Sequence, residues 1–283
     1  MGSPISGKDG ILKNFEGTVG FITGAAGGIG FAVAEALAQR GMMMMLADIE
    51  ADTLADAAQR LAVYDTEIAT VVLDVSDLEA YQHAATATLE RFGKVNFLFN
   101  NAGVGAGSFA GEGAIDDWRW VINVNLLGVV YGVECFLPGM RLLDEPCHIL
   151  NTASMAGHVA HPGMGAYTAT KYAVVGYSET LEMELIESNV GVSVLCPAWV
   201  KTRIADSRRN HPDGQGLDPQ SSLSKDIAKV IEDDGMLPAE VAQMVISGMA
   251  NEELYLFTHP EFWSPLEQRM DRVRGAYQRI TPI

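Results

Sequence analysis

Short apolar runs alternate with helix-like segments along most of this 283-residue chain. The runs are typical of buried strands, and between them apolar residues recur every three or four positions, as on one face of a helix. Strands joined through helices pair in parallel, because each helix crosses back over the sheet. The pattern predicts an α/β fold with a doubly wound parallel sheet of about seven strands. The expected strands are 18–23, 42–46, 68–73, 95–99, 148–152, 190–195 and 254–257, and the expected helices are 31–40, 52–63, 77–92, 116–137, 165–188, 238–250 and 262–279.

A glycine-rich turn joins the first expected strand to the first expected helix. Thr23 is followed by Gly24-Ala-Ala-Gly-Gly28-Ile29-Gly30. Glycines let the backbone approach a pyrophosphate, and a helix N-terminus favours its negative charge. A glycine cluster alone could form only a tight turn. Its place between a strand and a helix favours a dinucleotide site in a single-domain Rossmann fold.

Asp48 closes the second expected strand, 18 positions after Gly30. An acidic residue about 20 positions after such a turn accepts hydrogen bonds from the adenosine ribose. Its charge would repel a 2′-phosphate, and neither Ala26 nor the residue after Asp48 is basic. The sequence therefore favours NAD over NADP. The alternative is that Asp48 only caps the helix expected at 52–63.

Tyr167 and Lys171 lie four residues apart in the helix expected at 165–188, so their side chains share one face. A nearby ammonium group would lower the pKa of the phenol from its usual value of about 10. Tyr167 is therefore predicted to act as a general base near neutral pH. This spacing alone arises by chance, and the alternative is a surface tyrosine beside a solvated lysine. Further motifs in a fixed order favour the catalytic interpretation.

These motifs together resemble the short-chain dehydrogenase/reductase family over roughly residues 17–200. The family patterns TGxxxGxG, the aspartate after the third strand, NNAG and YxxxK match Thr23–Gly30, Asp74, Asn100–Gly103 and Tyr167–Lys171. The catalytic asparagine and serine of the family match Asn125 and Ser154. Ala198 departs from the pattern, because the family has glycine after the proline that matches Pro197.

The resemblance implies a role for each matched residue. Tyr167 would be the acid/base on the substrate oxygen, and Lys171 would lower its pKa and hold the nicotinamide ribose. Ser154 would hydrogen-bond the carbonyl or alkoxide, and Asn125 would keep a helix kink and a water relay to Lys171. A hydride would pass between a secondary alcohol or ketone and NAD. The residues expected to contact NAD are Gly24, Gly28, Ile29, Gly30, Asp48, Ile49, Asp74, Val75, Asn100, Asn101, Ala102, Gly103, Tyr167, Lys171, Pro197, Val200 and Thr202.

The chain is expected to form one domain over 15–283 after a flexible tail at 1–14. Residues 203–238 interrupt the alternation and predict a substrate lid, with a helical patch near 224–232. Arginines in this lid would lie near the cofactor phosphates or merely pair with surface carboxylates. Residues 258–283 form a C-terminal extension. The lid and tail resemble those of bacterial Cα-dehydrogenases of lignin β-aryl-ether breakdown, which implies a bulky aromatic or hydrophobic alcohol.

Charge and composition narrow the partners. Nineteen basic residues against 36 acidic ones give a net charge of −17, which argues against nucleic acid and anionic membranes. No run approaches the roughly 20 apolar residues of a membrane span, and no Cys or His spacing suggests a metal site. We expect a cytoplasmic protein. The helices at 116–137 and 165–188 are apolar on more than one face and so need a second partner, and the family resemblance implies that they pack in a homodimer or homotetramer.

Other functions remain open at this level. They are a steroid-type or short-chain hydroxy-compound dehydrogenase, a non-catalytic NAD-sensing protein on the same fold, and an epimerase or dehydratase. An intact set of four catalytic residues argues against the sensor, because a sensor need not keep them all.

Overall fold

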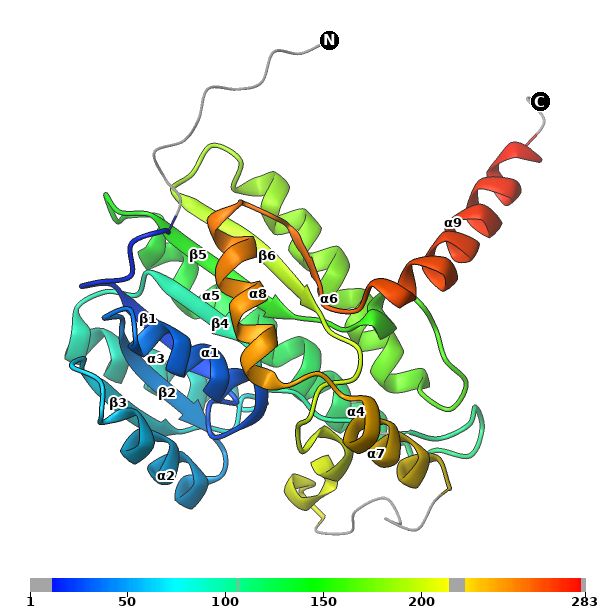
Figure 1. The fold of residues 1–283 in the computed structure, drawn as a ribbon, viewed down its shortest axis with the longest axis horizontal. Helices are drawn as coiled ribbons and strands as arrows, with labels where there is room; N and C mark the ends of the chain where they lie inside the picture. The colour runs from blue at the N-terminus through cyan, green and yellow to red at the C-terminus, as the bar shows by residue number, and fades with distance from the viewer. Residues whose placement is uncertain (1–11, 106, 214–221, 281–283) are drawn as a thin grey trace.

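Seven parallel strands form one sheet in the computed structural model, which describes residues 12–105, 107–213 and 222–280 (Figure 1). The order across the sheet is β3-β2-β1-β4-β5-β6-β7. The strands are β1 (Val19–Thr23), β2 (Met43–Asp48), β3 (Ile68–Val72), β4 (Phe97–Asn100), β5 (Cys147–Thr152), β6 (Val190–Cys196) and β7 (Tyr255–Phe257). The order reverses between β1 and β4, and ligands in such sheets bind beyond the strand ends at this point. The predicted doubly wound fold is confirmed.

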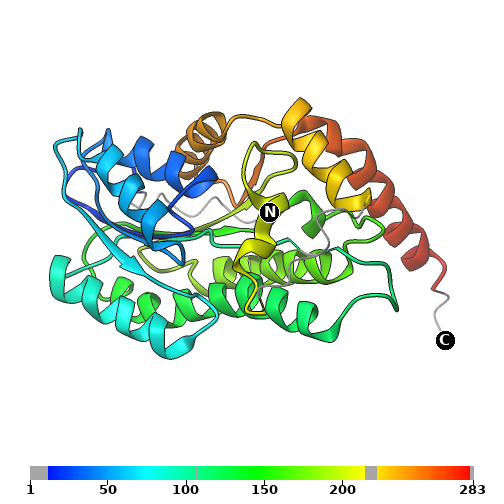
Figure 2. The same cartoon turned by 90° about the horizontal axis from the view of Figure 1, so that it is seen from below.

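Helices cover both faces of the sheet (Figure 2). On one face lie α1 (Gly28–Ala38), α2 (Ala51–Leu61) and α8 (Pro238–Ala250); on the other lie α3 (Leu78–Phe92), α4 (Ile115–Ile122), α5 (Gly128–Met140) and α6 (Gly165–Glu184). The strands are apolar on both sides for this reason. In β2, Met44 and Leu46 belong to one core cluster, and Met45 and Ala47 belong to the other.

The long helix around Asn125 differs from its prediction. It was expected to stop before Pro138, but α5 continues to Met140 with Pro138 inside its last turn. Phe136 and Met140, 2% and 1% exposed, anchor that turn in the core and keep the helix going past the proline. Between α4 and α5, residues Asn123–Leu127 form a π-helix. Helix periodicity predicted one continuous helix here and gave no sign of that turn.

This composite helix also qualifies the statement that no apolar run approaches a membrane span. Ile115–Met140 has 26 residues and a mean hydropathy of 1.6 over its most apolar stretch, which suffices by length and composition. More than half of that stretch is buried inside the fold. A core helix of a globular domain gives the same signal, and this helix packs on the sheet between α3 and α6.

The remaining described elements follow β5 and β6. They are short helices at Met155–Gly157, Ile204–Asn210 and Pro260–Phe262, then α7 (Ser222–Asp234) and the terminal α9 (Trp263–Gln278). Residues 1–11 of the predicted tail and 214–221 of the predicted lid lie outside the described residues. Leu12 is 2% exposed and packs in the core, so the ordered domain includes residues that were assigned to the tail.

Candidate functional site

The glycine turn after β1 has the geometry of a dinucleotide cradle. Gly24 and Gly28 have φ angles of +64° and +54°, which side chains disfavour. A Cβ on Gly30 would lie 2.2 Å from the carbonyl oxygen of Gly24, so only glycine allows α1 to approach β1 this closely. At the start of α1, Gly27 provides no side-chain cap. The helix N-terminus is thus open to an anion.

Asp48 is fixed at the end of β2 by main-chain donors. One carboxylate oxygen accepts from the Ala26 amide at 3.0 Å, and the other accepts from the Glu50 amide at 3.0 Å. The carboxylate therefore connects the glycine turn to the segment that follows β2. The alternative role as a cap for α2 is not seen, because the residue before α2 is Glu50 and no side chain caps that helix.

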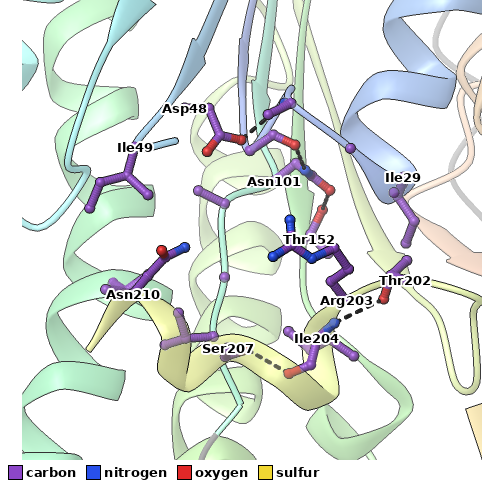
Figure 3. A pocket seen from close by; sticks show the side chains of 18 of the residues that line it. Ile29, Asp48, Ile49, Asn101, Thr152, Thr202, Arg203, Ile204, Ser207 and Asn210 are labelled. Atoms are coloured by element: carbon purple, nitrogen blue, oxygen red, sulfur yellow. Dashed lines mark hydrogen bonds between the residues drawn. The ribbon is translucent and has the colours of Figure 1, made fainter. Parts of the chain in front are cut away.

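A cavity of about 280 Å³ runs past these groups along the strand ends (Figure 3). It reaches from Asp48 and Ile49 at one end to Tyr167 and Lys171 at the other. Most residues predicted to bind the cofactor line it: Gly24, Gly28, Ile29, Asp48, Ile49, Asp74, Val75, Asn101, Ala102, Gly103, Tyr167, Lys171, Pro197, Val200 and Thr202.

Two predicted cofactor residues do not line this cavity. Gly30 lies behind the turn, where it permits close packing of α1. Asn100 is 1% exposed and points into the core. It accepts from the Tyr81 hydroxyl at 3.2 Å and donates to Asn151 at 2.9 Å. Its assignment as a cofactor contact is therefore not supported, because β4 alternates and turns this side chain away from the cavity.

Residues 203–211, called the strap below, line the opposite side of the cavity from the strand ends (Figure 3). Glu50 ties the strap to the start of α2. It accepts from Arg209 at 2.6 Å, from Asn210 at 3.0 Å and from Arg203 at 3.0 Å. Burial alone would raise the pKa of Glu50, but the hydrogen bonds from Asn210 and Arg209 and the arginine charges lower it to about 2. The sequence gives no sign of this role of Glu50, because its partners lie more than 150 positions away.

The strap is also fixed at its far end. Arg208 donates to both oxygens of Asp117 on α4 at 2.9 Å, and both side chains are 14% exposed. The His211 ring lies edge-on to Trp120, with 4.7 Å between the ring centroids. In the middle, the Ser207 hydroxyl accepts from the Gly105 amide at 2.9 Å. Each strap arginine pairs with a carboxylate, as the plainer of the two sequence interpretations expected.

Three of the predicted catalytic side chains meet at the end of the cavity opposite Asp48. Tyr167 and Ser154 are joined by a side-chain hydrogen bond. The Lys171 ammonium donates to the carbonyl oxygen of Thr152 at 2.8 Å and lies 5.5 Å from the centre of the Tyr167 ring. Strand β5 supplies Thr152 and leads to Ser154, and α6 supplies the other two. The i, i+4 spacing therefore places Tyr167 and Lys171 as predicted.

The expected pKa shift of Tyr167 is not found in the chain alone. Burial raises the pKa of Tyr167, and the hydrogen bond with Ser154 offsets this only in part. Burial also lowers the pKa of Lys171 to about 8, although the nearby Cys196 opposes this change. The ammonium charge alone would lower the pKa of Tyr167, but burial removes water from around both groups and disfavours the charged form of each.

Asn125 lies in the π-helix and is fully buried near Lys171. It accepts from the Val104 amide at 2.8 Å and donates to the Val104 carbonyl at 2.9 Å. A Cβ on Gly103 would lie 3.4 Å from the Asn125 oxygen and 3.6 Å from the Lys171 nitrogen. Asn125 thus holds the segment after β4 beside Lys171, from a local break in the helix as predicted.

A second cavity, of about 110 Å³, adjoins the first at Tyr167. Most of its lining is apolar: Gly105, Gly107, Met155, Ala156, Met164, Ala198, Trp199, Ile204, Ala205, Ile227, Ile231 and Phe262, with Ser154, Tyr167 and His161 as the remaining groups. Met236 and Leu237, at the far end of the insertion 203–238, are not among them. Met236 instead pairs through its main chain with Trp199 and Lys201 and closes the base of the insertion.

Comparisons with known proteins agree with this geometry. The family model for short chain dehydrogenases matches residues 18–213. The chain belongs to the short-chain dehydrogenase/reductase family. It is 33% identical over 272 residues to a "CLA biosynthesis dehydrogenase/reductase" of Lactiplantibacillus plantarum, covering 93% of this chain and 95% of that one. It is 32% identical to a "C alpha-dehydrogenase" of a Sphingobium species, covering 96% and 94%. A short-chain dehydrogenase/reductase from Burkholderia phymatum, solved in complex with NAD, superposes with a TM-score of 0.89 at 39% identity, covering 95% of this chain and 99% of that chain.

This short-chain dehydrogenase/reductase accommodates alanine at position 198 without backbone strain. Among the described residues, Glu252 is the one non-glycine residue with positive φ, so Ala198 does not need the freedom of glycine. Its methyl group lies on the boundary of both cavities. The departure from the family pattern therefore adds apolar surface near Tyr167.

Proposed function

We propose that this oxidoreductase transfers a hydride between a secondary alcohol or ketone and NAD. One observation carries the proposal: a single cavity joins the Asp48 carboxylate to Tyr167 and Lys171, and an apolar cavity opens at the same tyrosine. Such a cavity suits an extended dinucleotide lying across the switch point of the sheet. The second cavity suits the substrate beside its reactive end.

The choice of NAD follows from charge. Asp48 projects at the adenosine end, and the two arginines nearest to it are held by Glu50. At this end of the cavity, a 2′-phosphate would meet the Asp48 carboxylate, and the described arginines there are already paired with Glu50. The NAD complex of the Burkholderia relative supports the same choice.

The chain's own residues handle the proton. During alcohol oxidation, the substrate hydroxyl would lose its proton to the Tyr167 oxygen, and Ser154 would donate a hydrogen bond to the developing oxyanion. Lys171 would stabilise the phenolate and contact the nicotinamide ribose, and Asn125 would hold the loop that lines this end. When bound, NAD supplies the acceptor for the hydride that leaves the carbinol carbon. Ketone reduction is the reverse.

The substrate is proposed to be bulky and apolar or aromatic. Trp199, Ile231 and Phe262 reach the cavity from three different segments, and few groups there can satisfy a polar substrate. We further propose that the chain forms one domain, with the strap and α7 as its lid. The protein would be cytoplasmic and would bind small molecules rather than nucleic acid or membranes. It would form a homodimer or homotetramer through α5 and α6.

The test is a panel of aryl carbinols, steroids and short-chain secondary alcohols with NAD, monitored through NADH absorbance. Tyr167→Phe removes the proton acceptor and should lower kcat by about 100-fold or more while NADH still binds, as measured by its fluorescence. Thr168→Val, a change of similar size next to Tyr167, is the matched control and should keep most activity. Turnover of Tyr167→Phe near that of the wild type would refute the mechanism, and absence of NADH binding would refute the function.

A further inference from the structure

The terminal helix α9 leaves its apolar side chains in solvent. It stands out from the body and points away from the sheet (Figure 1). No residue of α9 is buried, and Trp263, Met270, Val273 and Tyr277 are 58%, 44%, 57% and 77% exposed. Among the described elements, the adjacent short helix Pro260–Phe262 packs most closely against it, and Arg269 contacts Tyr172 of α6. A helix that exposes aromatic and aliphatic groups in this way lacks a partner.

The spacing of the apolar residues of α9 indicates that the missing partner is another protein surface. Trp263, Leu266, Met270, Val273, Tyr277 and Ile280 follow one another at intervals of three and four, the repeat with which helices pack on helices. At a rise of 1.5 Å per residue, the stripe runs about 24 Å along α9. This length matches several turns of a facing helix.

The charges of α9 are opposite to those of the rest of the chain. Residues 263–280 hold four arginines and two acidic residues, whereas the whole chain has 36 acidic against 19 basic residues. Arg274 flanks the stripe, and Arg272 lies on the same distal half. A basic helix on an acidic molecule fits an acidic partner surface.

The same chain carries such a surface at the C-terminal end of α6. The acidic patch, defined here as Glu182, Met183, Glu184, Ile186 and Glu187, is exposed throughout. Met183 and Ile186 are 74% and 60% exposed. Like α9, the patch combines apolar side chains with charge, but its charge is negative. The chain therefore carries both halves of a complementary pair.

We propose that α9 of one copy packs on the acidic patch of a second copy. The root of α9 lies on α6, with the Arg269 guanidinium 5.1 Å from the centre of the Tyr172 ring. Tyr172 is near the N-terminal end of α6 and the patch is at the other end. If two copies pack α6 against α6 antiparallel across a two-fold axis, the patch of the partner lies beside this root. The two-fold axis then forms the contact twice.

The proposal rests on the assembly through α5 and α6 proposed above. Variants that reverse the charges of α9 and of the acidic patch test the α9 contact separately from that assembly. Light scattering and sedimentation would be measured for the wild type, for R272E/R274E, for E184R/E187R and for the four changes together. Each pair reverses charge on exposed residues, and circular dichroism checks the fold. K13E/R40E is the control, since it makes the same change in net charge as the α9 pair at the N-terminal side of the molecule.

Each double variant should dissociate at a protein concentration roughly tenfold higher than the wild type. The four changes together should restore association. The control K13E/R40E should associate like the wild type. A wild type that stays a 30.4 kDa monomer at micromolar concentration would overturn both the α5/α6 assembly and the contact of α9 with the acidic patch. If the wild type is an oligomer and both double variants leave it unchanged, only the contact of α9 with the acidic patch would be overturned. Loss in each double variant without recovery in the combined one would overturn the pairing of α9 with the patch.

Discussion

At the scale of single residues, the Asp48 carboxylate is held in place by two main-chain donors, so its charge cannot turn away from a 2′-phosphate. Asp48→Ala should raise kcat/KM for NADP relative to NAD by about tenfold or more, which corresponds to about 1.4 kcal/mol of removed repulsion. The measurement is the ratio of the two kcat/KM values. Asp52→Ala, an exposed acid in the first turn of α2, is the control and should leave the ratio unchanged. A wild type that already prefers NADP would contradict the role given to Asp48.

His148 provides a pH-dependent prediction. It is 3% exposed, and its ring donates to the Ser193 hydroxyl, which in turn donates to the Glu253 carbonyl. Burial lowers the pKa of His148 from 6.5 to about 4, so the unfolded chain binds a proton in this window and the folded chain does not. Stability from this residue is full above pH 6.5 and is lost as the pH falls to 4, by up to about 3 kcal/mol.

Urea unfolding at several pH values tests this prediction. His148→Gln should flatten the dependence of the free energy of unfolding on pH between 6.5 and 4, whatever its effect at neutral pH. His83→Gln, on the exposed face of α3, should keep the slope of the wild type. Equal slopes for His148→Gln and the wild type would show that another group governs stability in this range.

At the scale of elements, the strap and the start of α2 close the adenosine end of the cavity through Glu50. Glu50→Gln keeps the shape of the side chain and removes the charge that holds Arg203 and Arg209, so the strap should open more often. NADH should then dissociate about 10-fold faster, in line with the loss of a partly buried charge-assisted contact. Stopped-flow fluorescence measures that rate.

The control for the strap is Glu67→Gln, which removes an exposed pair with Arg91 far from the cavity. It should leave NADH release unchanged. Release from Glu50→Gln at the wild-type rate would mean that the strap does not limit cofactor exchange.

The elements also show which parts of the site could be predicted from sequence. The glycine turn, Asp48 and Tyr167–Lys171 could be predicted, because each depends on spacing within one or two adjacent elements. Glu50 could not, since its role depends on contacts with residues 203–210. Asn100 was assigned to the cofactor from its motif, whereas the alternation of β4 turns its side chain into the core. The π-helix around Asn125 has no periodic signal, and the pKa of Tyr167 depends on burial that only the packed structure provides.

At the scale of the whole molecule, the order of elements along the chain predicted the sheet and both helical layers, because parallel crossovers allow few other arrangements. The ends were harder to predict. The apolar residues of α9 are as periodic as those of a core helix, yet α9 projects from the body. The apolar repeat of a helix indicates a packing partner, but it does not distinguish a partner in the same chain from one in another copy of the chain.

The contacts of Glu50 also carry a consequence for how the protein matures. They join residues 153 to 160 positions apart, and contacts of such separation are costly to form early in folding. A ribosome releases Asp48 and the glycine turn long before the strap exists, so a nascent chain has a phosphate cradle without its cover. The complete nucleotide site therefore belongs to the finished fold alone. A nucleotide that binds only this state favours it by about 2.7 kcal/mol at a concentration of 100 times Kd. Binding of the nucleotide would therefore shift the folding equilibrium of this protein towards the finished fold.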